Sequence, residues 1–237
     1  MKRISARSIS IMIFMMIGLQ FWAVSQPTIK VKRSDLKRDV LMRTDSGDIV
    51  IRLSDSTPIH RDNFIRLVRS GFYKGIGFHR VIYGFMIQAG DEKSRANADS
   101  TAFLKNYTLP AEFRPSLFHK KGVIAAARMG DNVNPQKESS GTQFYVVQGK
   151  QFTNAGLDST ETLRLKGRKI PDEHRMIYKT IGGAPHLDQN YTIFGELVSG
   201  IEVVDKIAST KTTGREGGDK PLQDIRILKT AMVKRKN

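Results

Sequence analysis

The sequence has no cysteine and only one tryptophan among its 237 residues. Without cysteine the chain can form no disulfide, can hold no cysteine-ligated zinc and has no thiol nucleophile. Histidine is also scarce, and the spacing of the five histidines matches no metal-ligand pattern. They are His60, His79, His119, His174 and His186. These absences disfavour a metal enzyme.

Acidic residues are few relative to basic ones, with 23 Asp and Glu against 39 Lys and Arg, which gives a formal net charge of +16. Such a balance favours anionic surroundings, such as a nucleic acid, a phospholipid surface or acidic partners. The basic groups at 30–33 and 234–236 are short, and no aromatic residues that could stack on bases are interleaved with them. We therefore expect a solvated basic surface that can meet anionic surfaces, and no nucleic-acid site.

Residues 1–25 have the three-part layout of a secretory signal peptide. Three basic residues precede an apolar run over 9–24, and Ala23-Val24-Ser25 is a small-x-small cleavage pattern. Gly18 and Gln20 interrupt the run, which makes it a poor membrane span. We expect export and a mature chain without a transmembrane segment. An uncleaved N-terminal anchor is the alternative.

The next part of the chain predicts a short lead-in, a hairpin and a helix. Residues 26–38 are polar and without periodicity, which indicates a flexible lead-in. Two β-rich runs, 39–44 and 48–53, flank the glycine-containing turn at 45–47. Pro58 at a first helical position and an apolar stripe up to Gly71 predict a helix over 58–70.

The rest of the chain predicts mainly strands. They are expected at 77–82, 85–89, 122–127, 143–148, 193–198 and 225–230, with a second helix over 200–207. Many short strands with two helices favour a mainly β fold, a closed antiparallel barrel with helices covering its ends, because an open sheet of that size leaves edges to protect. Residues 130–140 and 150–184 are expected to be long polar loops outside the barrel. The second of them contains a weak helical pattern at 161–165.

The stretch GFHRVIYGFMIQAGD, residues 77–91, places a cation among apolar side chains with no acidic residue before Asp91. Arginine stays protonated, so Arg80 can donate hydrogen bonds and charge but cannot act as an acid or a base. Phe85, Met86 and Gln88 add an aromatic face, a thioether and an amide. This set suits an apolar ligand with a polar backbone. A surface arginine on an ordinary strand is the alternative.

The same stretch resembles the central motif of cyclophilin-type peptidyl-prolyl isomerases, FHRxIxGFMxQxGD. Three further blocks, GVIAAAR, SGTQFYV and HLDQNYTIFGELVSGIEVVDKI, match the family in the same order. Together the four blocks span about residues 40–230. The resemblance implies an eight-stranded antiparallel β-barrel with two capping helices over 39–237, with an insertion at about 150–184. It also implies cis-trans isomerisation of Xaa-Pro bonds without a cofactor.

The resemblance implies that Arg80 is the catalytic residue. Apolar side chains would wall a proline pocket, with Phe144 beside it. Two glutamines would bind peptide carbonyls or orient Arg80, and the backbone at Ala127 and Arg128 would pair with the substrate. The implied substrate-binding set is Phe85, Met86, Gln88, Ala127, Arg128, Gln143, Phe144, Tyr145, His186, Leu187 and Tyr191.

The Xaa-Pro amide has a rotation barrier of roughly 18–20 kcal/mol, which falls when amide resonance is weakened. A donor aimed at the prolyl nitrogen stabilises its lone pair in the twisted state. We expect Arg80 to do this without a partner carboxylate, which would draw it away.

Two departures, His186 for a tryptophan and Tyr191 for a histidine, resemble bacterial members of the family and weaken the expectation of tight cyclosporin binding. With the N-terminal signal they favour the bacterial periplasm, ahead of the endoplasmic reticulum lumen, and a role in folding exported proteins that contain proline. A proline-peptide binding module or chaperone with little turnover remains an alternative, and so does an adhesion device for anionic surfaces. The insertion is expected to shape access to the site or to bind a partner.

Overall fold

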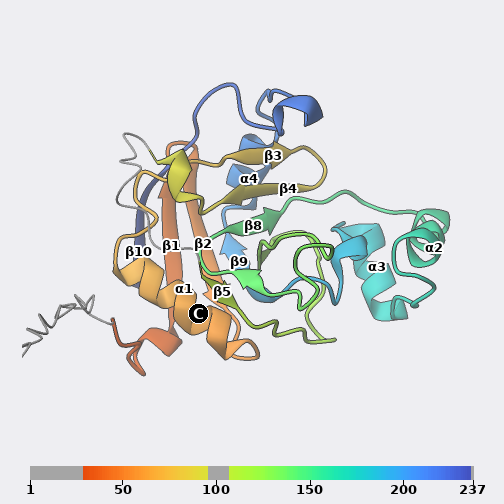
Figure 1. The fold of residues 1–237 in the computed structure, drawn as a ribbon, viewed down its shortest axis with the longest axis horizontal. Coiled ribbons are helices and arrows are strands. Elements are labelled where there is room, and N and C mark those ends of the chain that lie inside the picture. Colours follow the sequence, from red (N-terminus) through yellow and green to blue (C-terminus); the bar gives the residue numbers. More distant parts are fainter. Residues whose placement is uncertain (1–28, 96–106, 236–237) are drawn as a thin grey trace, which may run out of the picture.

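A curled antiparallel sheet of eight strands forms the centre of the molecule (Figure 1). The computed structural model describes residues 29–95 and 107–235, so the signal segment expected at 1–25 lies outside the described residues. The strand order in the sheet is β10-β1-β2-β9-β6-β8-β4-β3. The strands are β1 (Arg38–Thr44), β2 (Gly47–Leu53), β3 (Arg80–Ile82), β4 (Met86–Ala89), β6 (Val123–Ala126), β8 (Phe144–Val147), β9 (Ile193–Ser199) and β10 (Ile227–Lys234). All eight correspond to strands expected from the sequence.

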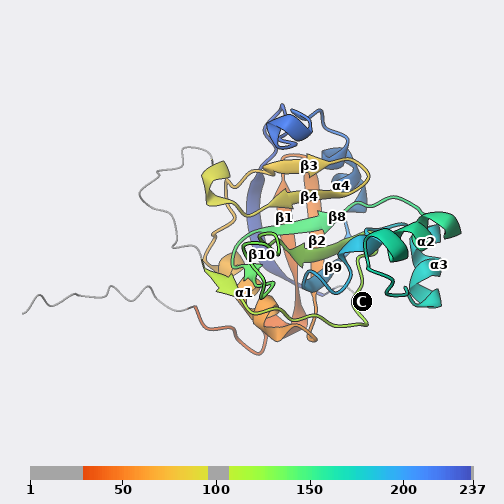
Figure 2. The ribbon, with the colours of Figure 1, turned by 45° about the vertical axis from the view of Figure 1, so that its right-hand side comes forward.

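Four α-helices and a two-stranded ribbon complete the described fold, where the sequence predicted two helices. The two expected helices are α1 (Pro58–Arg69), which packs against β9 and β10, and α4 (Ile201–Ala208), which packs against β2, β3 and β4. The other two, α2 (Asn154–Leu163) and α3 (Asp172–Thr180), lie in residues 150–184, the segment expected to be an insertion, and project from one end of the sheet (Figures 1 and 2). The ribbon pairs β5 (Thr108–Leu109) with β7 (Ser139–Ser140). Short 3-10 turns occur at Asp35–Lys37, Glu92–Ser94, Pro185–Leu187 and Arg215–Gly217.

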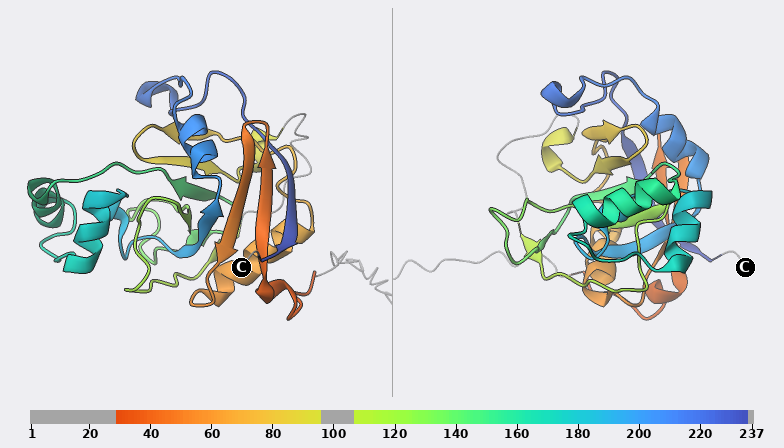
Figure 3. Two further views of the ribbon diagram at one scale, coloured as in Figure 1. Left: turned by 180° about the vertical axis from the view of Figure 1, so that it is seen from behind. Right: turned by 90° about the vertical axis from the view of Figure 1, so that its right-hand side faces the viewer.

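The sheet is strongly curled, but its edge strands β3 and β10 do not pair with each other. Backbone hydrogen bonds instead join the segment before β3 to the start of β10 and the residues before it: Phe78 N donates to Ile225 O at 2.8 Å and Ile227 N donates to Ile76 O at 2.9 Å. The expected closed barrel is therefore confirmed only as a curled eight-stranded antiparallel sheet. The three long strands β10, β1 and β2 run side by side in the view from behind (Figure 3).

The concave face of the sheet holds the main apolar core. Alternate residues of each strand point to it, because side chains of a β-strand alternate between the two faces. Helix α1 covers it with one stripe: Phe64 contacts Phe194 at a ring-centroid distance of 5.1 Å and Phe144 at 5.6 Å. Both rings are almost fully buried. The opposite face of β4, β6 and β8 carries a second, smaller apolar cluster, and this one concerns the site.

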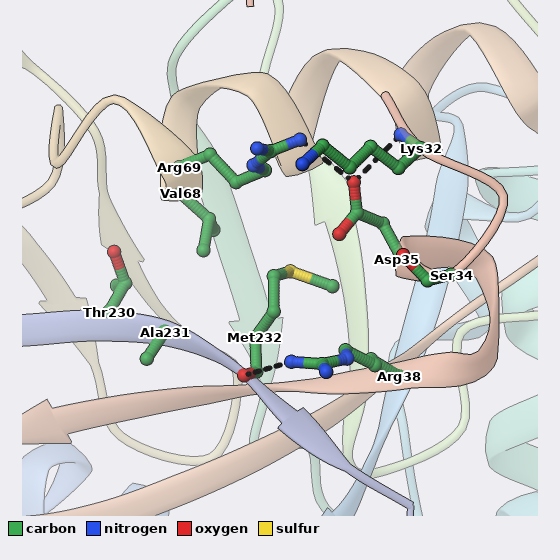
Figure 4. Close-up of a pocket in the computed structure, with 9 residues that line it drawn as sticks. All are labelled: Lys32, Ser34, Asp35, Arg38, Val68, Arg69, Thr230, Ala231 and Met232. Atoms are coloured by element: carbon green, nitrogen blue, oxygen red, sulfur yellow. Dashed lines mark hydrogen bonds and ion pairs between the residues drawn. The ribbon is translucent and has the colours of Figure 1, made fainter. Parts of the chain in front are cut away.

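The described part of the expected lead-in, residues 29–37, is anchored on the outer side of α1. The Asp35 carboxylate is only 7 % exposed, accepts from the Lys32 backbone N–H at 2.8 Å and pairs with the Arg69 guanidinium at 3.1 Å (Figure 4). A cavity of about 410 Å³ lies between this segment, α1 and β10. Residues 30–35 thus contact the end of α1 through polar groups. No helix within 29–95 and 107–235 is both long enough and apolar enough to cross a membrane.

Gly200 connects β9 to α4 in a conformation that other residues tolerate poorly. Its φ is +94°, and a Cβ at this position would lie 2.5 Å from the Asp48 carbonyl oxygen and 2.8 Å from the Ile49 Cα. A side chain would therefore meet rigid backbone in addition to strained dihedrals.

We expect Gly200→Ala to lower the free energy of unfolding by about 2–4 kcal/mol, because strain and overpacking add. Gly71→Ala is the matched control: Gly71 also has a positive φ, +73°, but nothing lies within 4 Å of its Cβ position. It should cost only about 1 kcal/mol of strain. Urea unfolding of both variants measures the difference, and equal losses would refute the backbone clash.

Candidate active site

The register of four neighbouring strands places residues from different parts of the chain on one line. Arg80 of β3 pairs with Gln88 of β4, Gln88 pairs with Tyr145 of β8, and Tyr145 pairs with Ala125 of β6. Directly paired residues of an antiparallel sheet share a face, and residues two apart along a strand share it too. Met86 therefore lies on the same face as Arg80, Gln88 and Tyr145. The pairing brings a fixed cation, an amide and two large side chains together.

Around this line the outer face carries a compact apolar cluster. Met86, Tyr145 and Leu187 are almost fully buried in it, and Phe85 and Tyr191 pack against it while partly exposed. The rings of Tyr145 and Tyr191 meet edge to face at 5.8 Å. An apolar surface with two partly exposed aromatic rings can contact a small apolar ring of a ligand.

Phe144 does not belong to this surface, although it was expected in the substrate-binding set. Its neighbour Tyr145 faces outward, so Phe144 must face the interior, where it is 1 % exposed. It contacts Tyr73 at 5.4 Å and Phe64 at 5.6 Å, both nearly perpendicular to it. Phe144 adjoins Tyr145 along the chain, but the alternation of the strand sends its side chain to the core.

Arg80 has an acidic neighbour that the sequence did not suggest. Asp219, from the loop between α4 and β10, holds its Oδ2 atom 3.5 Å from the Arg80 Nε atom. The same residue accepts a hydrogen bond from the Val81 backbone N–H through its carbonyl oxygen at 2.9 Å. The expectation that Arg80 has no partner carboxylate is wrong.

The pair is nevertheless loose. Its 3.5 Å separation exceeds the usual length of an N–H···O hydrogen bond, and the Arg80 side chain is 43 % exposed. Exposed ion pairs of this kind contribute little, about 0–1 kcal/mol. Asp219 can therefore hold the guanidinium near the site, and within the described residues no hydrogen bond occupies its other N–H groups.

Polar groups border the apolar cluster on the other side. The Gln88 side-chain amide donates to Gln143 Oε1 at 3.1 Å, and Gln143 O accepts from the Ala127 N–H at 3.0 Å. Both glutamines line a cavity of about 470 Å³, together with Ala127 and Arg128. The Ala127 carbonyl oxygen is also used, by the Ser140 N–H at 2.8 Å, so the backbone of Ala127 is fully paired. Backbone pairing with a peptide falls to Arg128 in this segment.

The Arg128 side chain is fixed among its neighbours. Its Nε atom donates to the Asn190 carbonyl oxygen at 2.7 Å, its guanidinium lies 4.6 Å from the centroid of the Tyr191 ring, and it pairs with Asp131 at 2.7 Å. It is only 5 % exposed. Arg128 thus forms a wall between the 470 Å³ cavity and a second cavity of about 370 Å³, which is lined by His186, Leu187 and Tyr191.

A buried polar network holds Tyr145 from behind, and the sequence did not reveal it. The Tyr145 hydroxyl lies 2.9 Å from His119 Nε2, and His119 Nδ1 lies 2.9 Å from Asp188 Oδ1. The other Asp188 oxygen accepts from the Tyr178 hydroxyl of α3 at 2.7 Å. Burial raises the pKa of both tyrosine hydroxyls well above 10, so both stay protonated and act as donors. The network fixes Tyr145 and ties it to the insertion.

One signal pointed to this network. A tyrosine hydroxyl buried in an apolar cluster needs a hydrogen-bonding partner, and Tyr145 stands where the family motif accepts phenylalanine or tyrosine. The sequence did not show which residue supplies the partner, because His119 lies 26 positions from Tyr145 and 69 positions from Asp188. Within the described residues, no three His, Cys, Asp or Glu side chains cluster closely enough to hold a metal ion.

His186 lies at the rim, with its ring 5.3 Å from that of Phe85. Burial, and next the positive charge of Arg164, lower its pKa from 6.5 to about 4. The imidazole is therefore neutral near pH 7. As the pH falls from about 6.5 to about 4, the unfolded chain takes up a proton at this position before the folded chain does.

We expect this difference to make the free energy of unfolding rise with pH over that window, by about 1–2 kcal/mol from His186. His186→Gln should remove the contribution, which urea unfolding near pH 4 and near pH 7 can measure in both proteins. The variant should lose less stability on acidification than the parent. An unchanged pH dependence would show that His186 is not held in its neutral form.

Comparisons with known proteins agree with this geometry. Residues 39–232 match the family described as "Cyclophilin type peptidyl-prolyl cis-trans isomerase/CLD". A Staphylococcus haemolyticus protein named "Putative peptidyl-prolyl cis-trans isomerase" is 32 % identical over 202 residues, which covers 85 % of this chain and 94 % of that protein. A Staphylococcus saprophyticus protein of the same name is 32 % identical over 189 residues, covering 79 % and 88 %.

Solved structures agree on the fold. A cyclophilin type peptidyl-prolyl cis-trans isomerase of Cryptosporidium parvum superposes with a TM-score of 0.59 at 22 % identity, over 84 % of this chain and 98 % of that one. The same enzyme in the presence of the dipeptide Ala-Pro gives a TM-score of 0.58, also at 22 % identity, over 84 % and 99 %.

Proposed function

The chain belongs to the cyclophilin-type peptidyl-prolyl cis-trans isomerases, and we propose that it applies this activity to proline-containing segments of exported proteins, with Arg80 acting on the prolyl amide. The observation that carries the assignment of residues is the cross-strand line Arg80–Gln88–Tyr145. It brings the only cation of the motif onto the face that carries the apolar cluster. The substrates are unfolded or extended polypeptides, for which the Ala-Pro dipeptide used with the Cryptosporidium parvum enzyme is a minimal example.

The apolar cluster accounts for recognition of the prolyl ring. Proline presents a compact hydrocarbon surface, which gains free energy when it leaves water, at roughly 25 cal/mol per Å². Phe85 and Tyr191 are partly exposed at the edge of Met86, Tyr145 and Leu187, so they can close around such a ring. The His119 hydrogen bond holds Tyr145 in place. A preorganised wall costs little entropy when the ligand binds.

Polar groups on either side would hold the peptide backbone. Gln88 and Gln143 are hydrogen-bonded to each other and border the 470 Å³ cavity, where they can turn to a peptide carbonyl. The backbone of Arg128 adds a donor and an acceptor in an extended segment. A chain held at several points on both sides of the proline can rotate only about the prolyl bond.

Rotation about that bond is the whole reaction, since no bond is broken. The twisted state localises the lone pair on the prolyl nitrogen, and a charged donor there stabilises it more than it stabilises the planar amide. Each 1.4 kcal/mol of that difference gives about a tenfold rate increase. Arg80 keeps its charge at all relevant pH values, and its loose pairing with Asp219 leaves N–H groups for this task.

We expect Arg80→Ala to lower kcat/KM by about 10²–10³, the usual cost of removing one charge-stabilising donor. Exchange spectroscopy by NMR on a short Xaa-Pro peptide measures cis-trans rates directly. Peptide binding should persist, because the apolar cluster is untouched. Exchange that survives the substitution would refute the role of Arg80, and binding without accelerated exchange in the parent protein would favour the binding-module alternative.

Asp219→Asn serves as the companion to that variant. Because the Arg80–Asp219 pair is long and exposed, its removal should change kcat/KM by no more than about threefold. A loss as large as that of Arg80→Ala would mean that Asp219 sets the position of the guanidinium.

Export is the second part of the proposal. It is supported by the basic start, apolar run and small-x-small pattern in residues 1–25, and the bacterial periplasm is the proposed destination. Fractionation of cells that express the full chain, with mass spectrometry of the N-terminus, tests it. Recovery from the periplasm with an N-terminus near Gln26 is expected, and a full-length chain in the cytoplasm would contradict it.

A further inference from the structure

A cationic cavity adjoins the proline site, and part of its lining comes from the turn that follows α2. It has a volume of about 370 Å³ and shares Leu187, Tyr191 and the wall residue Arg128 with the site described above. On its other side lie Arg164, Lys166 and Arg168, which come from the turn between α2 and α3. A peptide held at Leu187 and Tyr191 therefore has this cavity directly beside it.

Cations dominate the lining. Arg128, Lys137, Arg164, Lys166 and Arg168 face one carboxylate, that of Asp131. Arg128 already pairs with that carboxylate at 2.7 Å, and Lys137 lies 4.0 Å from it. The remaining three charges have no acidic side chain among the residues that line the cavity.

The three cations of the insertion differ in how they are held. Arg168 donates to the Asp188 carbonyl oxygen at 2.5 Å, which neutralises no charge. The side chains of Arg164 and Lys166 make no hydrogen bond or ion pair to any residue in 29–95 and 107–235, and both are exposed. Both residues line the cavity. The charge of Arg164 helps to lower the pKa of His186, after burial, and the charge of Lys166 contributes, after the hydrogen bond from Arg128, to lowering the pKa of Asp131.

The turn that carries them is fixed in place. Leu165 is buried in an apolar cluster with Leu157, Ile170 and Tyr178. The Gly167 N–H donates to the Glu161 carbonyl oxygen at 2.8 Å. The Glu161 side chain is buried as well, and it holds Lys169 and Arg175 at 2.7 Å each. Because the backbone of the turn is already fixed, only the side chains of its cations have to be ordered when they bind an anion.

From this arrangement we propose that the cavity is an anion subsite that selects proline-containing substrates with an acidic side chain, Asp or Glu, close to the proline. The inference rests on the proposed function, because it uses the same bound peptide. A polypeptide is favoured over a free anion or a lipid surface by continuity: Leu187 and Tyr191 line both the apolar cluster and the cavity. A peptide with a carboxylate on the correct side would meet three cations that form no ion pair with an acidic side chain of the cavity lining.

The test compares peptides that differ only in charge. A neutral Ala-Pro peptide is prepared with Glu, Gln or Lys at each position within three residues on either side of the proline. NMR exchange gives kcat/KM for each peptide with the parent protein. At one or more positions on the same side of the proline, the Glu peptide should have a kcat/KM about fivefold higher than the Gln peptide, which is the effect of one or two exposed ion pairs. The Lys peptide should have a lower kcat/KM than the Gln peptide at the same positions. Raising the ionic strength to about 0.5 M should abolish the difference, because the Debye length falls to a few Å.

Variants locate the effect. Arg164→Gln with Lys166→Gln removes two cavity charges that no described hydrogen bond needs, and it should erase the Glu preference while leaving the neutral peptide unchanged. Lys179→Gln with Lys206→Gln is the control, since both are exposed helix residues outside the cavity and the change in net charge is the same. The control should keep the preference. In the single variant Arg164→Gln, the pKa of His186, measured by NMR, should rise. A rise would show that the removed charge acted on the cavity.

Three results would overturn the inference. These are equal kcat/KM for Glu and Gln peptides, an equal loss of the preference in both double variants, and binding to anionic vesicles that depends on Arg164 and Lys166 without any Glu preference. Failure of the proposed function looks different, because the neutral peptide would then show no accelerated exchange with any protein.

Discussion

The register of β3, β4 and β8 is the constraint on which the active face depends. Pairing Arg80 with Gln88 and Gln88 with Tyr145 puts the cation, the amide and the aromatic ring on one side. A slip of one residue in β8 would replace Tyr145 by Phe144 on that face and turn the hydroxyl into the core. The interior rings that contact Phe144 oppose such a slip, so core packing and active-site geometry are set by the same pairing.

The insertion has become part of the site through polar contacts. The Tyr178 hydroxyl of α3 reaches Asp188, Asp188 orients His119, and His119 meets the hydroxyl of Tyr145. Buried groups of this kind are costly when left unpaired, so each member holds the next one in a defined place. The same insertion fixes the cationic turn around Leu165. Its helix α3 thus supports the Tyr145 side chain through this network, and the turn between α2 and α3 lines the cationic cavity.

Much of this could be predicted from the sequence, because alternation, turn glycines and helix start signals are local. All eight strands of the main sheet and helices α1 and α4 were anticipated, and so was the grouping of Met86, Gln88, Tyr145 and Leu187 through the family motifs. Features that depend on distant contacts were not. The Asp219 partner of Arg80 lies 139 positions away in a loop without a motif, and the open edges of the sheet depend on how far it curls. Phe144 was misjudged because a motif gives positions along the chain and does not state which face a side chain takes.

Intermolecular NOEs test most directly whether the outer face of β3, β4 and β8 binds the prolyl ring. A short Xaa-Pro peptide, bound to the protein, should show contacts from its prolyl ring protons to the Met86 methyl group, the Phe85 ring and the Leu187 methyl groups. Contacts would contradict the account if they went instead to Leu53 and Leu117, which line a separate cavity of about 310 Å³ near β2 and β9. The proline site would then lie elsewhere on the sheet.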